Sequence, residues 1–199
     1  KNPPDRRVVF SPQKLKEFQE QFPKAILKVE SSDIRVFSDD SYKSEGIQVS
    51  EKMDDCDVLF GVKEVPVDNL IPNKKYFFFS HTIKKQPYNR DLLNAILDKK
   101  IELFDHETIV KENGARLIGF GRYAGIVGAY NGFRAIGLKS GAFQLPKAEI
   151  LDSQQELIEQ LQNIELSNIK ILLTGNGKVA YGAKEMLDAM NILEVTTEE

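Results

Sequence analysis

Short runs of apolar residues alternate along the chain with segments in which apolar residues recur every three to four positions. Buried parallel strands are apolar on both faces, whereas crossover helices are apolar on one, so this alternation predicts an α/β fold with a parallel sheet. The apolar runs predicted to be strands are Arg7–Phe10, Ala25–Val29, Val58–Val62, Tyr76–Phe79 and Ile101–Phe104.

Capping and turn residues place the connections between these strands. Ser11 supplies an N-cap and Pro12 the first helical position of one helix, and a second helix is expected at Asn89–Leu97. After the fifth strand, Asn113 and Gly114 form a dipeptide that favours a two-residue hairpin turn. We therefore expect a β-hairpin to follow the parallel strands.

The pattern becomes helical again at Gly121–Leu138, which we interpret as a helix connecting two domains. Its small residues at helical spacing suit close packing against another element. Ser153 then opens a capping box, and Lys170–Leu173 is predicted to be a strand. The small residues of the connecting helix are Gly125, Gly128, Ala129 and Gly132.

A glycine-rich turn follows the last predicted strand and matches the pattern G-x-G-x-x-G/A at the head of a helix. Gly175 permits the tight turn, Gly177 lets the backbone approach a pyrophosphate, and Ala180 keeps the helix close to the strand. This order predicts the opening of a Rossmann dinucleotide-binding domain, and the alternative is a tight turn that binds nothing. Glu194 is the only acidic residue on the next candidate strand, Ile192–Val195, so NAD and NADP are not distinguished.

We expect two domains in a piece of a longer polypeptide. Residues 1–138 would form a substrate-binding and catalytic domain with its connecting helix, and residues 139–199 a linker and the incomplete start of the dinucleotide-binding domain. A dinucleotide domain needs several more strands. The chain alone is therefore expected to bind the cofactor poorly and to be inactive.

Composition narrows the classes of partner. Lys and Arg number 27 against 30 Asp and Glu, a formal net charge of -3, which argues against a nucleic-acid partner. One cysteine and two histidines do not form a metal cluster or a disulfide, so no metal is expected. The sequence contains neither a signal peptide nor an apolar membrane span, so a cytoplasmic location is predicted, and the oligomeric state stays open.

Titratable residues follow three of the predicted strands. Lys63 and Glu64 come at the end of the third strand, His81 after the fourth and Glu107 after the fifth. Ligands of parallel sheets gather at the carboxyl ends of strands, so these residues could form an acid–base set. The alternative is a solvated turn or a hydrogen-bonded histidine. Arg7, with the paired donors of its guanidinium, is a candidate for binding a substrate carboxylate.

Several of these segments resemble a known family. Residues 5–12 are similar to the E-x-R-x-x-x-T-P opening of alanine and saccharopine dehydrogenases, and residues 61–66 to their K-E/R-P segment. Residues 78–86 resemble the F-F-S-H-T-I-K-x-Q segment of the lysine-2-oxoglutarate reductase half of aminoadipic semialdehyde synthases. Residues 120–128 and 174–179 are similar to the A-F-G-x-x-A-G-x-x-G and T-G-x-G-x-V segments of the same enzymes.

The resemblance implies a flavodoxin-like N-terminal domain and an NAD(P)-dependent reductase that joins lysine to 2-oxoglutarate, giving saccharopine. It implies that Lys63 and His81 are an acid–base pair, that Glu64 and Glu107 tune it, and that Arg7 binds substrate. Asp5 stands where the family has Glu, and Val65 departs from its usual Arg. Two alternatives stay open: an alanine-dehydrogenase-like enzyme acting on a smaller oxo acid and ammonia, and a non-catalytic binding module.

Overall fold

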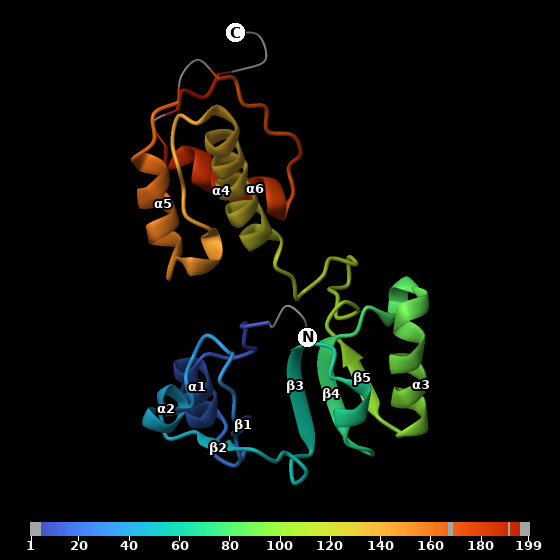
Figure 1. Ribbon diagram of the computed structural model, residues 1–199. Coiled ribbons are helices and arrows are strands. Elements are labelled where there is room, and N and C mark those ends of the chain that lie inside the picture. The colour runs from blue at the N-terminus through green and yellow to red at the C-terminus, as the bar shows by residue number, and fades with distance from the viewer. Residues whose placement is uncertain (1–4, 167–168, 191, 196–199) are drawn as a thin grey trace. The chain divides into compact units, whose positions relative to one another are not determined.

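The structure is a computed structural model that describes residues 5–166, 169–190 and 192–195. The chain divides into two compact units, Lys1–Ile118 and Gly119–Glu199. The helix that we expected to connect two domains belongs to the second unit. Figure 1 shows that strands and helices alternate in the first unit, whereas the second is built of helices and irregular segments.

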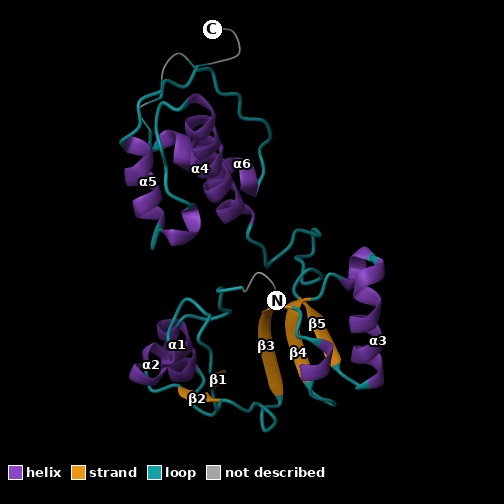
Figure 2. Ribbon diagram, viewed as in Figure 1, coloured by secondary structure: helices purple, strands orange, loops and turns teal. Residues whose placement is uncertain are grey.

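The strands of the first unit are parallel, which confirms the predicted α/β class. They form two sheets rather than one (Figure 2). A two-stranded sheet pairs β1 (Lys28–Glu30) with β2 (Gln48–Ser50), and a three-stranded sheet has the order β3 (Val58–Lys63), β4 (Lys75–Phe79), β5 (Glu102–Asp105). The C-terminal ends of β3, β4 and β5 therefore lie at one edge.

Three helices pack on these sheets: α1 (Pro12–Gln21), α2 (Asp39–Ser44) and α3 (Arg90–Asp98). The Ser11 hydroxyl accepts a hydrogen bond from the Lys14 amide at the start of α1, as its N-cap position predicts. On one face of the three-stranded sheet, α3 closes a core that also contains residues of β4. The buried residues of this core are Leu70, Tyr76, Phe78, Leu92, Ile96 and Ile101.

One prediction about the first 50 residues is wrong, and two elements there were not predicted. Arg7–Phe10 is not a strand, because no described strand pairs with it. The Phe10 carbonyl instead accepts from the side-chain hydroxyl of Tyr42 in α2 at 2.8 Å, and the carbonyl of Arg6, just before the segment, accepts from the Val36 amide. We did not predict α2 and β2, which are short and largely polar. Tyr42, 1% exposed, anchors α2 to a separate core that it forms with Leu15 and Ile47.

The hairpin predicted after β5 is present, but a single antiparallel bridge takes the place of two paired strands. Val110 and Arg116 form an isolated antiparallel bridge. The Lys111 amide donates to the Ala115 carbonyl, so three residues, not two, make the turn. Gly114 takes a left-handed φ of +76° at its third position, which is the geometry that such a loop requires.

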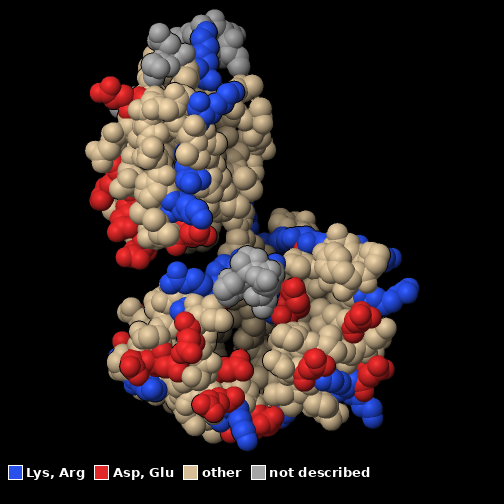
Figure 3. Space-filling model, in the orientation of Figure 1, with Lys and Arg blue, Asp and Glu red and all other residues tan. Residues whose placement is uncertain are grey.

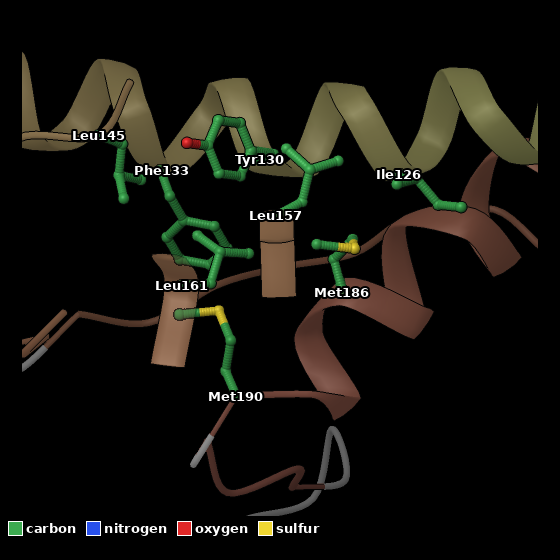
Figure 4. Close-up of a cluster of buried hydrophobic side chains, with 8 residues drawn as sticks. All are labelled: Ile126, Tyr130, Phe133, Leu145, Leu157, Leu161, Met186 and Met190. Atoms are coloured by element: carbon green, nitrogen blue, oxygen red, sulfur yellow. The ribbon is translucent and has the colours of Figure 1, made fainter. Parts of the chain in front are cut away.

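The second unit is formed by α4 (Gly121–Ser140), α5 (Gln154–Gln162) and α6 (Lys178–Asp188). Ser153 caps α5 by accepting a hydrogen bond from the Glu156 amide, as the capping box predicts. The three helices and the segment after α4 enclose one core, drawn in Figure 4. Its buried residues are Ile126, Tyr130, Phe133, Leu145, Leu157, Leu161, Met186 and Met190.

Helices α4 and α6 touch through their backbones at two glycines. A Cβ atom on Gly125 would lie 1.9 Å from the Val179 carbonyl oxygen, and one on Gly182 would lie 1.9 Å from the Arg122 carbonyl oxygen. The expected close packing of the α4 small residues thus occurs at Gly125. At Gly128 and Gly132, by contrast, a Cβ would meet nothing within 4 Å.

The predicted strands of the second unit are absent from its described residues. Lys170–Leu173 is irregular, with Leu172 82% exposed, and Ile192–Val195 is also irregular. A strand is defined by a ladder of hydrogen bonds to a neighbour, and the described part of this unit has no strand to provide one. Of the predicted Rossmann opening, the turn and the helix are present and the strand is not.

Charged side chains of both signs are interspersed over the two units on the face drawn in Figure 3. In the described residues, no helix is both long enough and apolar enough to cross a membrane.

Candidate functional site

The C-terminal ends of β3, β4 and β5 bring together residues that are far apart in the sequence. Lys63 is the last residue of β3, His81 follows β4 by two positions, and Glu107 follows β5 by two positions. Parallel strands that are neighbours in a sheet place these positions side by side. The structure thus assembles three of the four residues that we predicted to be catalytic.

The three side chains form a continuous chain of hydrogen bonds. Lys63 Nζ lies 2.8 Å from His81 Nε2, and His81 Nδ1 lies 2.8 Å from Glu107 Oε2. The histidine ring is 20% exposed and the Glu107 side chain 3% exposed. The arrangement is a cation, an imidazole and a buried carboxylate in a row, which is the geometry required to hold and move a proton.

The partners of His81 determine which of its nitrogens carries the proton. A carboxylate can only accept, so Glu107 selects the tautomer with hydrogen on Nδ1. Nε2 then presents a lone pair and accepts from the Lys63 ammonium. Lys84 Nζ also lies 2.9 Å from Nδ1, but it has a better acceptor in Glu107 Oε1 at 3.3 Å. The site thus holds an acid, Lys63, against a base, His81 Nε2.

Glu107 is the buried charge of the site, and cations surround it. Lys84 lies 3.3 Å and Arg116 3.5 Å from its Oε1 atom. Burial raises the pKa of Glu107, but the hydrogen bonds from His81 and Lys84 outweigh burial, so the pKa lies below its usual value. Glu107 therefore stays ionised and fixes the orientation of His81.

The backbone at His81 is held in a strained conformation. Its φ of +58° is in the left-handed region, which a residue with a Cβ rarely adopts. Asn89 Nδ2 donates to the His81 carbonyl at 3.0 Å, and the Ser80 hydroxyl donates to the buried Asp105 carboxylate. Asp105 also accepts from the Glu107 amide at 2.9 Å. One carboxylate therefore holds both Ser80, which precedes His81, and the backbone of Glu107.

The other two residues proposed for unit one differ from the central three. Glu64 follows Lys63, and its Oε2 atom is buried with no hydrogen-bond partner among the described residues. Arg7 makes a two-point contact with Asp5, its Nε lying 2.9 Å from Oδ1 and its Nη2 2.5 Å from Oδ2. Glu64 thus presents a buried acceptor, whereas the guanidinium fork of Arg7 already holds a carboxylate.

Sequence reasoning missed three residues that complete the site. We assigned no role to Lys84, Arg116 or Asp105. The signal for Lys84 is its spacing, since a single turn of 3-10 helix, Thr82–Lys84, follows His81 and returns Lys84 to the imidazole. The hairpin brings Arg116 back towards Glu107, and its sequence position gives no indication of that contact.

The glycine-rich turn lies in the second unit, and its geometry fits a dinucleotide phosphate. Gly175 has a φ of +95°, and Gly177 is the N-cap of α6 with no side-chain capping bond. A Cβ on Gly177 would meet nothing within 4 Å, so the backbone there faces open space. A Cβ on Gly175 would come 4.0 Å from the Ala180 Cβ, so the turn and the helix lie close together. The prediction that Ala180 packs the helix against a strand finds no strand among the described residues of this unit.

The described part of the chain contains neither a cluster of metal ligands nor an activated thiol. Its histidine, cysteine and acidic residues do not form a group of three that could hold a metal ion. Burial, and next the Asp55 carboxylate, raise the pKa of the Cys56 thiol, which is the opposite of what activates a nucleophile.

Comparisons with known proteins point to one group of enzymes. The family described as "Alanine dehydrogenase/PNT, N-terminal domain" matches residues 1–127. The chain is 31% identical over 176 residues to an alpha-aminoadipic semialdehyde synthase of Arabidopsis thaliana, covering 79% of this chain and 16% of that protein. It is 29% identical over 205 residues to the mitochondrial alpha-aminoadipic semialdehyde synthase of Bos taurus, covering 94% of this chain and 22% of that protein.

Shorter enzymes and a solved structure are also similar. A saccharopine dehydrogenase [NAD(+), L-lysine-forming] of Yarrowia lipolytica is 27% identical over 147 residues, which cover 67% of this chain and 38% of that protein. A solved L-alanine dehydrogenase has a TM-score of 0.59 at 18% identity and covers 92% of this chain and 48% of that chain, which shows the α/β fold. The chain thus spans less than half the length of each of these relatives.

Proposed function

The chain belongs to the alanine dehydrogenase/PNT N-terminal domain family, and from this premise we propose that it supplies the acid–base site of an NAD(P)-dependent oxidoreductase. The proposed reaction interconverts saccharopine with lysine plus 2-oxoglutarate by imine reduction. The single observation that carries the proposal is the hydrogen-bonded row of Lys63, His81 and Glu107. Such a row provides what imine chemistry needs from a protein.

The reaction requires proton transfer at two stages, and a protonated imine, before the hydride arrives. The lysine amine must lose a proton to attack the carbonyl, the carbinolamine oxygen must gain protons to leave as water, and the resulting imine must stay protonated. His81 Nε2 is the acceptor for the first step, and the Lys63 ammonium is the donor for the second. Glu107 keeps His81 oriented and stabilises the imidazolium, as a buried carboxylate does beside a catalytic histidine.

The charges around the site favour a substrate with carboxylates. Lys84 and Arg116 share one oxygen of Glu107, and their side chains are 44% and 57% exposed, so both keep donors for an anion. Arg7 stays in the proposal as a binder of substrate carboxylate that would exchange Asp5 for the substrate. The buried Oε2 of Glu64 offers an acceptor for the substrate amine. These groups match an amino acid and a 2-oxo acid.

The cofactor would be held by Gly175, Gly177 and Ala180, with the pyrophosphate on the uncapped amides of α6. When bound, a nicotinamide supplies the hydride that reduces the imine carbon. The choice between NAD and NADP stays open. The cytoplasmic location also stays a prediction, since the bovine relative is named as a mitochondrial protein.

The test is to compare substrate pairs with the complete protein. We expect oxidation of NADH or NADPH with lysine plus 2-oxoglutarate, and no oxidation with ammonia plus pyruvate. Oxidation with pyruvate alone would instead support an alanine-dehydrogenase-like activity, which the family name makes the second candidate. Oxidation with neither pair would favour a binding module that keeps the fold without the chemistry.

A further inference from the structure

A second histidine lies beside the site and takes no part in the proposed proton chain. His106 is 6% exposed, and its Nε2 lies 3.2 Å from the carbonyl oxygen of Gly61. Its Nδ1 is buried and has no partner among the described residues. Because a carbonyl only accepts, Nε2 carries the hydrogen and Nδ1 holds an unpaired lone pair.

A buried nitrogen without a partner is unusual and destabilises a fold. An apolar ring of similar size would fill the same space without that penalty. The position is already apolar in character, since the imidazole lies edge-on to Phe79 with ring centroids 5.1 Å apart and an interplanar angle of 65°. The reason for a histidine at this position is therefore the one hydrogen bond that its side chain makes among the described residues, to the Gly61 carbonyl.

Gly61 lies in a β-bulge that determines where Lys63 points. In the pairing of β3 with β4, Phe60 is opposite Phe77 and Lys63 is opposite Phe79, so three steps along β3 match two along β4. Successive side chains of a strand point to opposite faces, so the extra residue decides on which face Lys63 emerges. The kink is tight, because a Cβ on Gly61 would come 3.2 Å from the Lys63 carbonyl.

His106 follows β5, the edge strand opposite β3, and its side chain reaches across β4 to this bulge. Its backbone amide donates to the Phe78 carbonyl of β4 at 3.1 Å, while its side chain passes on to β3. The residue follows β5 directly and precedes Glu107. One residue thus connects all three strands at the edge where Lys63, His81 and Glu107 meet.

We infer that His106 is a positioning residue, which holds the Gly61 bulge so that Lys63 Nζ meets His81 Nε2. It acts through Gly61, and its imidazole is no proton donor or acceptor in the reaction. The inference rests on the proposed function, because it assigns the origin of the Lys63 geometry that the proposed chemistry uses.

The test compares two substitutions at this position in the complete protein. In His106→Gln, the amide nitrogen stands as many bonds from Cβ as Nε2 does, so it can still donate to Gly61. In His106→Phe, the ring stays and the donor is lost. We expect His106→Phe to lower kcat about tenfold or more with KM changed less than about twofold, and His106→Gln to keep most of kcat.

Thermal stability separates positioning from a structural role. His106→Phe removes a buried unpaired nitrogen but also removes the donor to the Gly61 carbonyl, and these two effects on stability oppose each other. Its melting temperature should therefore stay close to that of the unchanged protein while kcat falls. A lower melting temperature with kcat reduced equally in both variants would overturn the inference, because both effects would then come from a damaged fold.

A spectroscopic measurement keeps the inference testable if the proposed substrates are wrong. In long-range ¹H–¹⁵N spectra of the complete protein, His106→Phe removes the imidazole signals of His106 and His81→Gln removes those of His81, so the two rings are assigned by difference. We expect His106 to carry its hydrogen on Nε2, and the Nε2 shift of His81 to change in His106→Phe but not in His106→Gln. A hydrogen on Nδ1 of His106, or an unchanged His81 in both variants, would overturn the inference whatever the activity.

Discussion

The strand-end site of the first unit and the glycine turn of the second differ in what holds them. Lys63, His81 and Glu107 are fixed by side-chain hydrogen bonds at the ends of three paired strands. The turn at Gly175 and Gly177 is fixed on one side only, by the contact of α6 with α4, while Lys170–Leu173 before it is irregular.

The difference shows that the two kinds of site depend on different ranges of sequence. An acid–base site needs a few side chains at adjacent strand ends, and the first unit brings Lys63, His81 and Glu107 together there. A phosphate-binding turn needs a strand, and a strand needs a neighbour. The proposed proton chemistry would therefore be local to the first unit, whereas the proposed cofactor turn depends on strand pairing that the described residues do not supply. Changes in the two regions should have separable effects.

The largest effect should come from the strand-end site itself. Lys63→Met and His81→Gln in the complete protein should each lower turnover by about 10²–10⁴-fold, because each removes one partner of the proton chain. The melting temperature should change little, since both side chains lie at the edge of the fold. Turnover equal to that of the unchanged protein would contradict the acid–base assignment. Lys84→Met is the matched comparison and should have the smaller effect. Lys84 contacts the hydrogen-bonded row at Glu107 and at His81 Nδ1, and not at the Lys63–His81 contact where the proton is proposed to move.

Next in size is the effect of filling the helix contact that supports the glycine turn. Gly125→Val places carbon atoms where the Val179 carbonyl lies, so it should destabilise the second unit by about 3 kcal/mol or more. Gly128→Ala is the control, because that glycine is exposed with open space around it. It should stabilise by about 0.5–1 kcal/mol, as removal of a helix glycine does.

Denaturant unfolding of the two variants checks this prediction. If Gly125→Val and Gly128→Ala unfolded at the same denaturant concentration, the backbone contact between α4 and α6 would not be the support of the turn.

Gly177→Val should affect cofactor binding without affecting the fold. No atom lies within 4 Å of the position of the new Cβ, so the chain accommodates it. The side chain would meet the pyrophosphate, and cofactor affinity of the complete protein should fall by about tenfold or more. Fluorescence titration with NADH and NADPH measures the change. Unaltered affinity for both would leave the turn as a structural connection only.

The smallest effect concerns the acid side of the stability profile. The pKa of Glu107 is lowered in the folded state, so its ionised form stabilises the fold above the unfolded value of 4.5, and this stabilisation is lost as the pH falls through the lower folded value. Glu107→Gln should flatten that dependence below pH 4.5. Glu112→Gln, at an exposed position, is the control and should leave the profile unchanged. Urea unfolding measured from about pH 3 to 7 compares them.

The sequence predicted which residues gather at the strand ends better than it predicted the secondary structure elsewhere in the chain. Apolar runs marked β3, β4 and β5 correctly, so the residues after them were found by position alone. The error at Arg7–Phe10 has a physical reason, because an apolar run becomes a strand only where a neighbour offers a ladder. The same reason applies to Lys170–Leu173. Contacts that cross the sheet, such as Arg116 with Glu107, depend on how the chain returns and leave no local pattern.

The glycine contact between α4 and α6 also determines where the turn can yield. Backbone atoms in van der Waals contact cannot slide past each other without unpacking, so the N-terminal end of α6 moves only if α4 moves with it. Residues 169–174, by contrast, have no ladder to restrain them. If the turn adjusts to a bound phosphate, the segment that precedes Gly175 therefore bends, while α4 and α6 keep their positions relative to each other.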